Sequence, residues 1–549
     1  MNIALAQLNY KIGDFEANAT KIIKAIKEAE NKGADLILFS ELAVCGYPPL
    51  DLLNSGDFVN QTIETIHQIA KECVQIAAVV GGPSLNPGSK GKQLYNSAWL
   101  LQNGKATPAV HKTLLPTYDV FDEYRYFQPN ETFSVINIKG QRLAITICED
   151  IWDDRPVEHK FDRNHLYTLS PMQKLAALKP DLVINIAASP FSYHQHNIRQ
   201  QVICKKAAQY HLPIYYVNQT GANTELIFDG GSMVINAKGE VTHRLEFFEE
   251  EIFFTNTDER PQQSEQCHPE EINLIYRALI TGVRDYFAKS GLQKAVLGLS
   301  GGLDSAVTAA IAVAALGKEN VHGILMPSQY SSDHSITDAR DLSNNLGISH
   351  EIIPIKPIFE QFKTALAQTF TGKNEDVTEE NIQARIRGTL VMAYSNKFGN
   401  ILLNTTNKSE AAVGYGTLYG DMNGGLSVLG DVYKTQVFNL ARLINKEREI
   451  IPINTIIKPP SAELRPDQKD SDSLPEYEIL DAILFRYIEQ NKSLSEIVAD
   501  GFDEPTVTKT LKMVNRNEHK RFQAPPILRI TTKAFGFGRR IPIVSKINP

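Results

Sequence analysis

The sequence predicts two α/β units, each built around a largely parallel sheet. Apolar runs rich in Ile, Val, Leu and Ala alternate with helix-like segments on both sides of a polar, proline-bearing stretch at residues 258–271. The chain has 549 residues, more than one hydrophobic core usually serves. We therefore predict a first domain over residues 1–257, a linker over residues 258–271 and a second domain over residues 272–549.

Strand-like runs in both halves justify this division. Gly, Pro, Asn or Asp bounds most of them, and the helix-like stretch NATKIIKAIKEAENKGA ends at Gly33, as a helix cap would. In the second half the charged stretch at residues 465–478 predicts a surface loop. The runs of the first half are NIALAQLNY, ADLILFSE, IAAVVGG, YNSAWLL, RLAITICED, DLVINIAAS and PIYYVNQTG. Those of the second half are AVLGLS, VHGILMP, HEIIPI and NILLNTTN.

Composition and charge argue against several classes of protein. The formal net charge is -7, whereas nucleic-acid-binding domains favour a basic surface. No apolar stretch approaches the roughly 20 residues that span a bilayer, and the start MNIALAQLNY resembles a strand more than a signal peptide. Five scattered cysteines form no C-x-x-C pair, which disfavours a disulfide scaffold or a thiolate zinc site. We expect a cytoplasmic protein without nucleic-acid or membrane partners.

The stretch VLGLSGGLDSAVTAA at residues 296–310 carries a strong chemical signal. A strand, a glycine-rich turn and a helix build an anion site, because backbone N–H groups of the turn and of the helix start point at one place. We expect Gly301 and Gly302 to make room for a triphosphate, with hydroxyl donors from Ser300 and Ser305. A competing interpretation is that GLSGG is the G-x-S-x-G elbow of a serine hydrolase, which also needs an acid and a histidine downstream.

The hexapeptide S-G-G-x-D-S resembles the signature of the ATP pyrophosphatase, or PP-loop, family. The resemblance implies a doubly wound parallel sheet of the adenine nucleotide alpha hydrolase-like type, ATP as co-substrate and cleavage between its α- and β-phosphates. Carried over by position, the ATP-binding residues are Gly298, Leu299, Ser300, Gly301, Gly302, Leu303, Asp304 and Ser305.

Two further stretches resemble the NAD synthetases: ENIQARIRGTLVMAYSN at residues 380–396 and NTTNKSEAAVGYGTLYGDMNGGLSVLGDVYKTQV at residues 404–437. The resemblance implies that Thr405 also binds ATP. It further implies a deamido-NAD(+) site made by Asn381, Arg385, Glu410 and Lys520.

Asp304 and Glu410 each follow a predicted strand, and two such carboxylates suit Mg²⁺ ions that bridge phosphates. We therefore expect Mg²⁺ as a cofactor, held by these two acids. The three residues just before Glu410 differ from the family pattern. Ammonia-dependent relatives have His-Ala-Ala before the glutamate, where this chain has Asn407, Lys408 and Ser409.

The first half resembles the nitrilase, or carbon–nitrogen hydrolase, family over its whole length. The motifs are LILFSELAVCGYP with Glu41, VHKTLLPTYDVFDEYRYFQP with Lys112 and LAITICEDIW with Cys148. The resemblance implies an α-β-β-α sandwich and a Glu-Lys-Cys triad. Cys148 is then the nucleophile, with its thiolate favoured by Lys112. Lys112 also stabilises the oxyanion, and Glu41 moves the protons.

The same resemblance implies a glutamine site made by Tyr118, Glu123 and Ser189, in which Glu123 positions Lys112 and the substrate. Gln195 stands where the family has a lysine, and we assign it no role. The combined resemblances imply an enzyme that amidates deamido-NAD(+) to NAD(+) through an adenylated intermediate. Its ammonia comes from L-glutamine, and the family implies an internal channel and a homo-oligomer. Two alternatives stay open: another PP-loop glutamine amidotransferase, or an ammonia-dependent NAD synthetase whose first domain is only a docking module.

Overall fold

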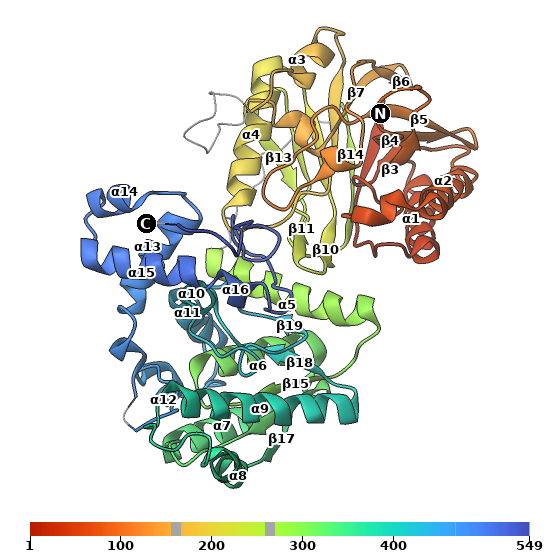
Figure 1. Ribbon diagram of the computed structural model, residues 1–549. Helices are drawn as coiled ribbons and strands as arrows, with labels where there is room; N and C mark the ends of the chain where they lie inside the picture. The colour runs from red at the N-terminus through yellow and green to blue at the C-terminus, as the bar shows by residue number, and fades with distance from the viewer. Residues whose placement is uncertain (155–165, 259–269, 467, 548–549) are drawn as a thin grey trace. The chain divides into compact units, whose positions relative to one another are not determined.

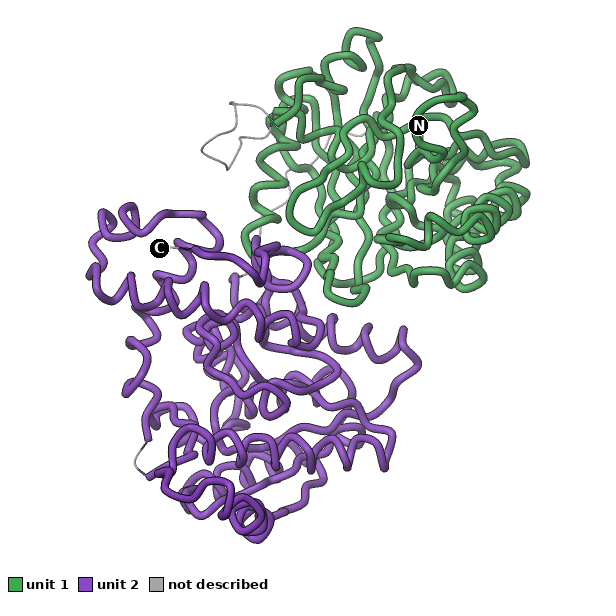
Figure 2. The backbone as a smooth tube through the Cα atoms, viewed as in Figure 1, with its two compact units in different colours: residues 1–268 green, residues 269–549 purple. Residues whose placement is uncertain are grey.

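In the computed structural model, the described residues are 1–154, 166–258, 270–466 and 468–547. The chain divides into two compact units, residues 1–268 and residues 269–549 (Figure 2). Most of the predicted linker, residues 259–269, lies outside the described part of the chain, so the linker stays a prediction. Within that part, no helix combines the length and the apolar character that a bilayer crossing requires.

Unit 1 is a four-layer α-β-β-α sandwich (Figure 1). In the described residues its two main sheets have six strands each, in the orders β14-β1-β2-β3-β4-β5 and β13-β12-β9-β8-β7-β6. The strands are β1 Asn2–Gln7, β2 Leu36–Leu38, β3 Ala77–Leu85, β4 Leu94–Gln102, β5 Lys105–His111, β6 Ile136–Ile138, β7 Gln141–Ile147, β8 Leu182–Ala187, β9 Ile214–Asn218, β10 Thr220–Asn223, β11 Leu226–Asp229, β12 Met233–Ile235, β13 Val241–Arg244 and β14 Glu251–Asn256. The helices are α1 Phe15–Asn31, α2 Gly56–Ala70, α3 Pro171–Ala176 and α4 Gln195–Tyr210.

The apolar pattern of β1 explains how these layers pack. Ile3 and Leu5 lie in the core between the two sheets, whereas Ala4 and Ala6 lie in a second core with residues of α1 and α2. Both faces of the strand are buried, which is why its sequence is apolar almost throughout. The seven predicted strands are confirmed as β1, β2, β3, β4, β7, β8 and β9. The strands that the sequence did not reveal are short or polar; β5, for example, reads KATPAVH.

Unit 2 contains a doubly wound sheet. In the described residues it has five strands, all parallel, in the order β17-β16-β15-β18-β19. The strands are β15 Ala295–Gly298, β16 Val321–Leu325, β17 Ser349–Ile352, β18 Ile401–Asn404 and β19 Leu426–Ser427. The helices are α5 Glu271–Ser290, α6 Leu303–Leu316, α7 Asp333–Leu346, α8 Lys356–Leu366, α9 Val377–Phe398, α10 Lys408–Val413, α11 Lys434–Ile444, α12 Ile453–Ile457, α13 Tyr477–Ile488, α14 Leu494–Ala499, α15 Glu504–Arg516 and α16 Glu518–Arg521. The four predicted strands are confirmed, and the two-residue β19 is an addition.

The strand order of unit 2 fixes where a ligand can bind. The chain moves outward from β15 to β16 and β17 and then returns across the sheet to β18. Because such crossovers are right-handed, the helices of the outward and the return paths lie on opposite faces of the sheet. β15 and β18 are neighbours at the point where the direction reverses. A crevice opens at the carboxyl ends of strands at such a switch point, and it is the usual ligand site of these sheets.

The predicted surface loop at residues 465–478 is only partly confirmed. Most of its described residues are exposed or half-buried, but Asp470 is buried. The Asp470 carboxylate accepts hydrogen bonds from Tyr477 OH at 2.8 Å and from Tyr415 OH at 3.1 Å. One acid of the charged stretch at residues 465–478, Asp470, therefore points into the protein and not toward solvent.

Candidate active sites

A buried charge cluster occupies unit 1. Lys112 Nζ lies 2.7 Å from Glu41 Oε1 and 2.7 Å from Glu123 Oε2. The side chains of Glu41 and Lys112 have no exposed surface. Asn96 Nδ2 donates to Glu41 Oε1 at 2.7 Å, and the Ala188 N–H donates to Glu41 Oε2 at 3.1 Å. Both oxygens of Glu41 are thereby held in place.

Strand ends bring the three predicted triad residues together. Glu41 comes shortly after β2, Lys112 directly after β5 and Cys148 directly after β7. Cys148 opens a 3-10 turn, Cys148–Ile151, with a φ of 45°. This left-handed conformation costs a non-glycine residue about 1–2 kcal/mol and recurs at functional sites.

Opposing charges act on the thiol of this cluster. Burial raises the pKa of Cys148 well above its usual value, and Glu41 raises it further. Lys112 lowers the pKa, in the direction expected for a neighbouring ammonium group. Burial also raises the pKa of Glu123, to about 7, against the opposing effect of Lys112. Lys112 therefore offsets only part of the cost of burying the Glu123 carboxylate.

The predicted glutamine-site residues bond to neighbours on adjoining loops. Tyr118 OH donates to Glu149 Oε1 at 2.8 Å, and Tyr167 OH donates to the same oxygen at 2.9 Å. The Ser189 N–H donates to Asn218 Oδ1 at 2.9 Å. Sequence reasoning missed Glu149, although its place beside the predicted nucleophile was a usable signal.

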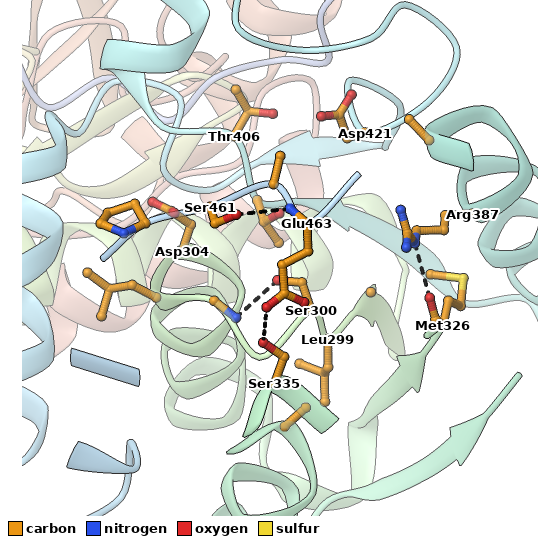
Figure 3. Close-up of a pocket in the computed structure, with 18 of the residues that line it drawn as sticks. Leu299, Ser300, Asp304, Met326, Ser335, Arg387, Thr406, Asp421, Ser461 and Glu463 are labelled. Carbon is orange, nitrogen blue, oxygen red and sulfur yellow. Dashed lines mark hydrogen bonds between the residues drawn. The ribbon is translucent and has the colours of Figure 1, made fainter. Parts of the chain in front are cut away.

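Unit 2 holds a cavity of about 320 Å³ at the carboxyl ends of β15 and β18. Figure 3 shows Ser300 and Asp304 toward one side of it and Arg387 on the other. The predicted residues that line it are Gly298, Leu299, Ser300, Gly302, Leu303, Asp304, Thr405 and Glu410. The predicted residues that do not line it are Gly301, Ser305, Asn381, Arg385 and Lys520.

Gly301 is needed where the turn meets α7. Its φ is 78°, and a Cβ built there would lie 2.2 Å from the Ser335 carbonyl oxygen of α7. Glycine at this position therefore lets the turn pack against α7, and its predicted role toward a phosphate stays a prediction. Gly302 lines the cavity and fits the expected purpose.

We predict that Gly301→Ala destabilises unit 2 by about 1–3 kcal/mol more than Gly291→Ala, because the overlap with Ser335 adds to the backbone strain. Gly291 is a matched control, since its φ is 71° and a Cβ there would meet nothing within 4 Å. Calorimetric unfolding of the two variants measures the difference. Equal destabilisation would show that α7 moves aside at little cost.

Asp304 and Glu410 meet at a lysine that sequence reasoning missed. Lys434 Nζ forms a short ion pair with Asp304 Oδ2 and lies 3.8 Å from Glu410 Oε1. Asn407 Nδ2 donates to Asp304 Oδ1 at 2.9 Å, which links α6 to α10. Burial and the nearby Asp304 carboxylate raise the pKa of Glu410 to about 8, although Lys434 opposes the rise. The positive charge of Lys434 therefore does not fully offset the burial and mutual repulsion of these two acids.

Comparison with known proteins identifies the family. Residues 2–158 match the carbon-nitrogen hydrolase family, and residues 275–524 match the NAD synthase family. A glutamine-dependent NAD(+) synthetase of Synechocystis sp. is 47% identical over 556 residues, covering 100% of this chain and 99% of the relative. The chain belongs to the glutamine-dependent NAD(+) synthetases. The synthetase of Thermotoga maritima is 42% identical, with 100% of this chain and 99% of that protein covered. A solved synthetase of Acinetobacter baumannii, in complex with ADP, matches with a TM-score of 0.78 at 39% identity, covering 99% of this chain and 98% of that one.

Membership in the synthetase family excludes two competing interpretations. A PP-loop amidotransferase of another kind does not fit relatives that match the whole chain. The serine hydrolase interpretation fails on geometry as well, because Ser300 Oγ pairs with Ser305 Oγ at 3.2 Å and accepts the Gly302 N–H at 3.1 Å. The described residues that line the cavity include no histidine.

In this synthetase, Lys408, one of the three residues that replace His-Ala-Ala, forms a buried ion pair. Lys408 is fully buried, and its Nζ lies 2.9 Å from Asp431 Oδ1. The Asp431 carboxylate also accepts the N–H groups of Ile530 at 2.8 Å and Thr531 at 2.7 Å. The helix α10, which carries Glu410, is thereby tied to the segment around residue 530.

The three remaining predicted residues converge on one loop of the synthetase, residues 414–418. Asn381 Oδ1 accepts from Thr417 Oγ1 at 2.7 Å, and Arg385 Nε donates to a carbonyl group of the loop at 3.2 Å. Lys520 Nζ donates to two more of its carbonyl groups, at 2.8 and 2.7 Å. These residues therefore share the loop even though they do not line the cavity.

Proposed function

We propose that this glutamine-dependent NAD(+) synthetase hydrolyses glutamine in unit 1 and adenylates deamido-NAD(+) in unit 2. The observation that carries the proposal is the cavity at the strand switch point, where the glycine-rich turn, Asp304 and Glu410 meet. Ligands of open α/β sheets bind at this kind of place. The buried cluster around Lys112 supports the assignment of unit 1.

In unit 1, the sulfur of Cys148 attacks the side-chain amide carbon of glutamine. As the new bond forms, Glu41 accepts the proton of the Cys148 thiol. The Lys112 ammonium, fixed between two carboxylates, donates to the oxyanion of the tetrahedral intermediate. Glu41 then gives its proton to the leaving ammonia, and later takes one from the water that hydrolyses the thioester.

Three further residues serve glutamine in this proposal. Glu123 holds Lys112 in place and is itself held by Tyr47 OH at 2.9 Å. Tyr118 and Ser189 contact the substrate, and their hydrogen bonds to Glu149 and Asn218 hold their segments in place.

In unit 2, a carboxylate oxygen of the nicotinate group attacks the α-phosphorus of ATP, and pyrophosphate leaves. The N–H groups at the start of α6, with Ser300, Ser305 and Thr405, receive the phosphate charge. Asp304 and Glu410 suit Mg²⁺, because two carboxylates that share one buried lysine are hard oxygen ligands short of positive charge. Bound Mg²⁺ supplies that charge and screens the phosphates. Ammonia then attacks the carbonyl carbon of the adenylate, and AMP leaves.

The loop at residues 414–418 completes the proposed deamido-NAD(+) site. Asn381, Arg385 and Lys520 all bond to this loop, so they set its position as well as offering polar groups to the dinucleotide. The homo-oligomer and the cytoplasmic location stay predictions of the sequence.

An omission assay tests the proposal. The full-length protein is incubated with ATP, Mg²⁺, deamido-NAD(+) and glutamine, and NAD(+), pyrophosphate and glutamate are measured. We expect equal amounts of NAD(+) and pyrophosphate, no NAD(+) when ATP, Mg²⁺ or deamido-NAD(+) is left out, and recovery with ammonium when glutamine is left out. NAD(+) formed without pyrophosphate, or formed in the presence of excess EDTA, would contradict the proposed chemistry of unit 2.

A further inference from the structure

We propose that Asp150 is a positioning residue that fixes the nucleophile Cys148 relative to Lys112. The proposal rests on the function proposed for the triad of unit 1. The buried Asp150 carboxylate forms its hydrogen bonds with backbone N–H groups next to Lys112 and next to Cys148, not with the two side chains themselves.

The contacts of Asp150 join the two strand ends that carry these residues. Its Oδ1 accepts the N–H groups of Thr113 at 2.9 Å and Leu114 at 2.8 Å, directly after Lys112. Its Oδ2 accepts the N–H of Ile147 at 3.1 Å, directly before Cys148. One carboxylate therefore bridges the residues next to both reactive groups.

The position requires a carboxylate and not merely a side chain of that size. All three partners are N–H donors, so both oxygens accept, and these bonds favour the ionised acid, whereas burial raises the pKa of Asp150 to about 7. An asparagine would turn an NH₂ group toward at least one N–H and leave a buried donor without a partner. Asp150 is 2% exposed, so water gives little compensation.

The bridge also holds the strained turn at the nucleophile. Cys148 has a φ of 45°, and the Ile147 N–H bonded to Asp150 stands at the entry of its 3-10 turn. Asn185 Nδ2 adds a longer bond of 3.4 Å to the Cys148 carbonyl oxygen. A strained conformation persists only where its surroundings over-determine it, and the Asp150 bridge is part of these surroundings.

The test is Asp150→Asn in the full-length protein, with kcat and KM for glutamine hydrolysis measured separately. We expect kcat to fall by about 100-fold and KM to change by less than about threefold, because a small misplacement of reacting groups slows chemistry more than binding. The bonds of Tyr118 and Ser189, the proposed glutamine contacts, go to Glu149 and Asn218. Ammonia-driven NAD(+) synthesis in unit 2 should stay unchanged.

Asp153→Asn is the matched control for stability. Asp153 is also a buried acid, three residues further along, but it pairs with Lys206 and Ser170 and not with the backbone beside the triad. Both tryptophans of the sequence, Trp99 and Trp152, belong to unit 1, so tryptophan fluorescence follows its unfolding. We expect Asp153→Asn to lower the unfolding midpoint while kcat stays near that of the unchanged protein.

Four outcomes decide the matter. A wild-type kcat in Asp150→Asn, or an equal loss of kcat in both variants, overturns the positioning role. If Asp150→Asn is too unstable to purify, the same test uses Asp150→Glu, because this change keeps the charge and displaces both oxygens by one methylene. An unchanged kcat in Asp150→Glu also overturns the proposal. Retained glutamine hydrolysis in Cys148→Ala would instead refute the triad assignment itself.

Discussion

Replacing Cys148 by alanine is expected to abolish glutamine-driven NAD(+) synthesis and to leave ammonia-driven synthesis intact. Loss of a nucleophile typically lowers kcat by at least about 10³-fold, because the residual binding groups cannot form the covalent intermediate. The described residues that line the cavity all belong to unit 2, so the ATP-dependent steps should not depend on the thiol. The measurement is NAD(+) formation with glutamine or with ammonium chloride as the nitrogen donor.

Cys45→Ala is the control for this experiment. Cys45 is a fully buried thiol close to Glu41 in the sequence, and burial raises its pKa to about 12. We expect this variant to use glutamine normally. If Cys148→Ala also used glutamine as well as the unchanged protein does, Cys148 would not be the nucleophile. A docking module would instead show itself in an unchanged protein that uses ammonium but not glutamine.

Replacing Glu410 by glutamine is expected to lower NAD(+) synthesis by at least about 100-fold with either nitrogen donor, while glutamate release from glutamine continues. The change removes one of the two carboxylates that face Lys434, and with it a proposed oxygen ligand of Mg²⁺. Glutamine at this position can still accept the Asn407 N–H, now 3.3 Å from Glu410 Oε2, so the start of α10 keeps its cap. Synthesis is measured over a range of Mg²⁺ concentrations.

Glu379→Gln provides the same chemical change in a different place. Glu379 occupies the corresponding position at the start of α9, where its Oε2 accepts the Asp376 N–H at 2.8 Å. This variant should synthesise NAD(+) normally. A Glu410→Gln variant with the Mg²⁺ dependence of the unchanged protein would remove Glu410 from the metal site.

Most of the fold could be predicted from the sequence, together with candidate reactive residues of unit 1. Apolar runs such as those of β1 and β8 are recognisable because a strand buried on both faces carries few polar residues. Glu41, Lys112 and Cys148 could be found because each stands in a family motif at the end of a strand. Strands such as β13, which reads VTHR, lack this apolar signal and could not be found in the same way.

Residues that act through contacts distant in sequence were harder to find. Lys434 looks like any lysine at a helix start, until the fold brings it to Asp304, 130 residues earlier in the chain. Asp150 resembles an ordinary acid beside the nucleophile, since its three partners are backbone groups that carry no residue-specific mark. Burial raises the pKa of Cys148, and a sequence motif does not reveal burial.

The hydrogen bond between Asp431 and Ile530 implies that unit 1 can finish folding before unit 2 during translation. Asp431 and Ile530 are 99 residues apart, so during translation α10 lacks this support until almost the whole of unit 2 has left the ribosome. The first unit is finished much earlier, when β14 has paired with β1. A nascent chain thus acquires the machinery for releasing ammonia before it has a finished place in which to consume it.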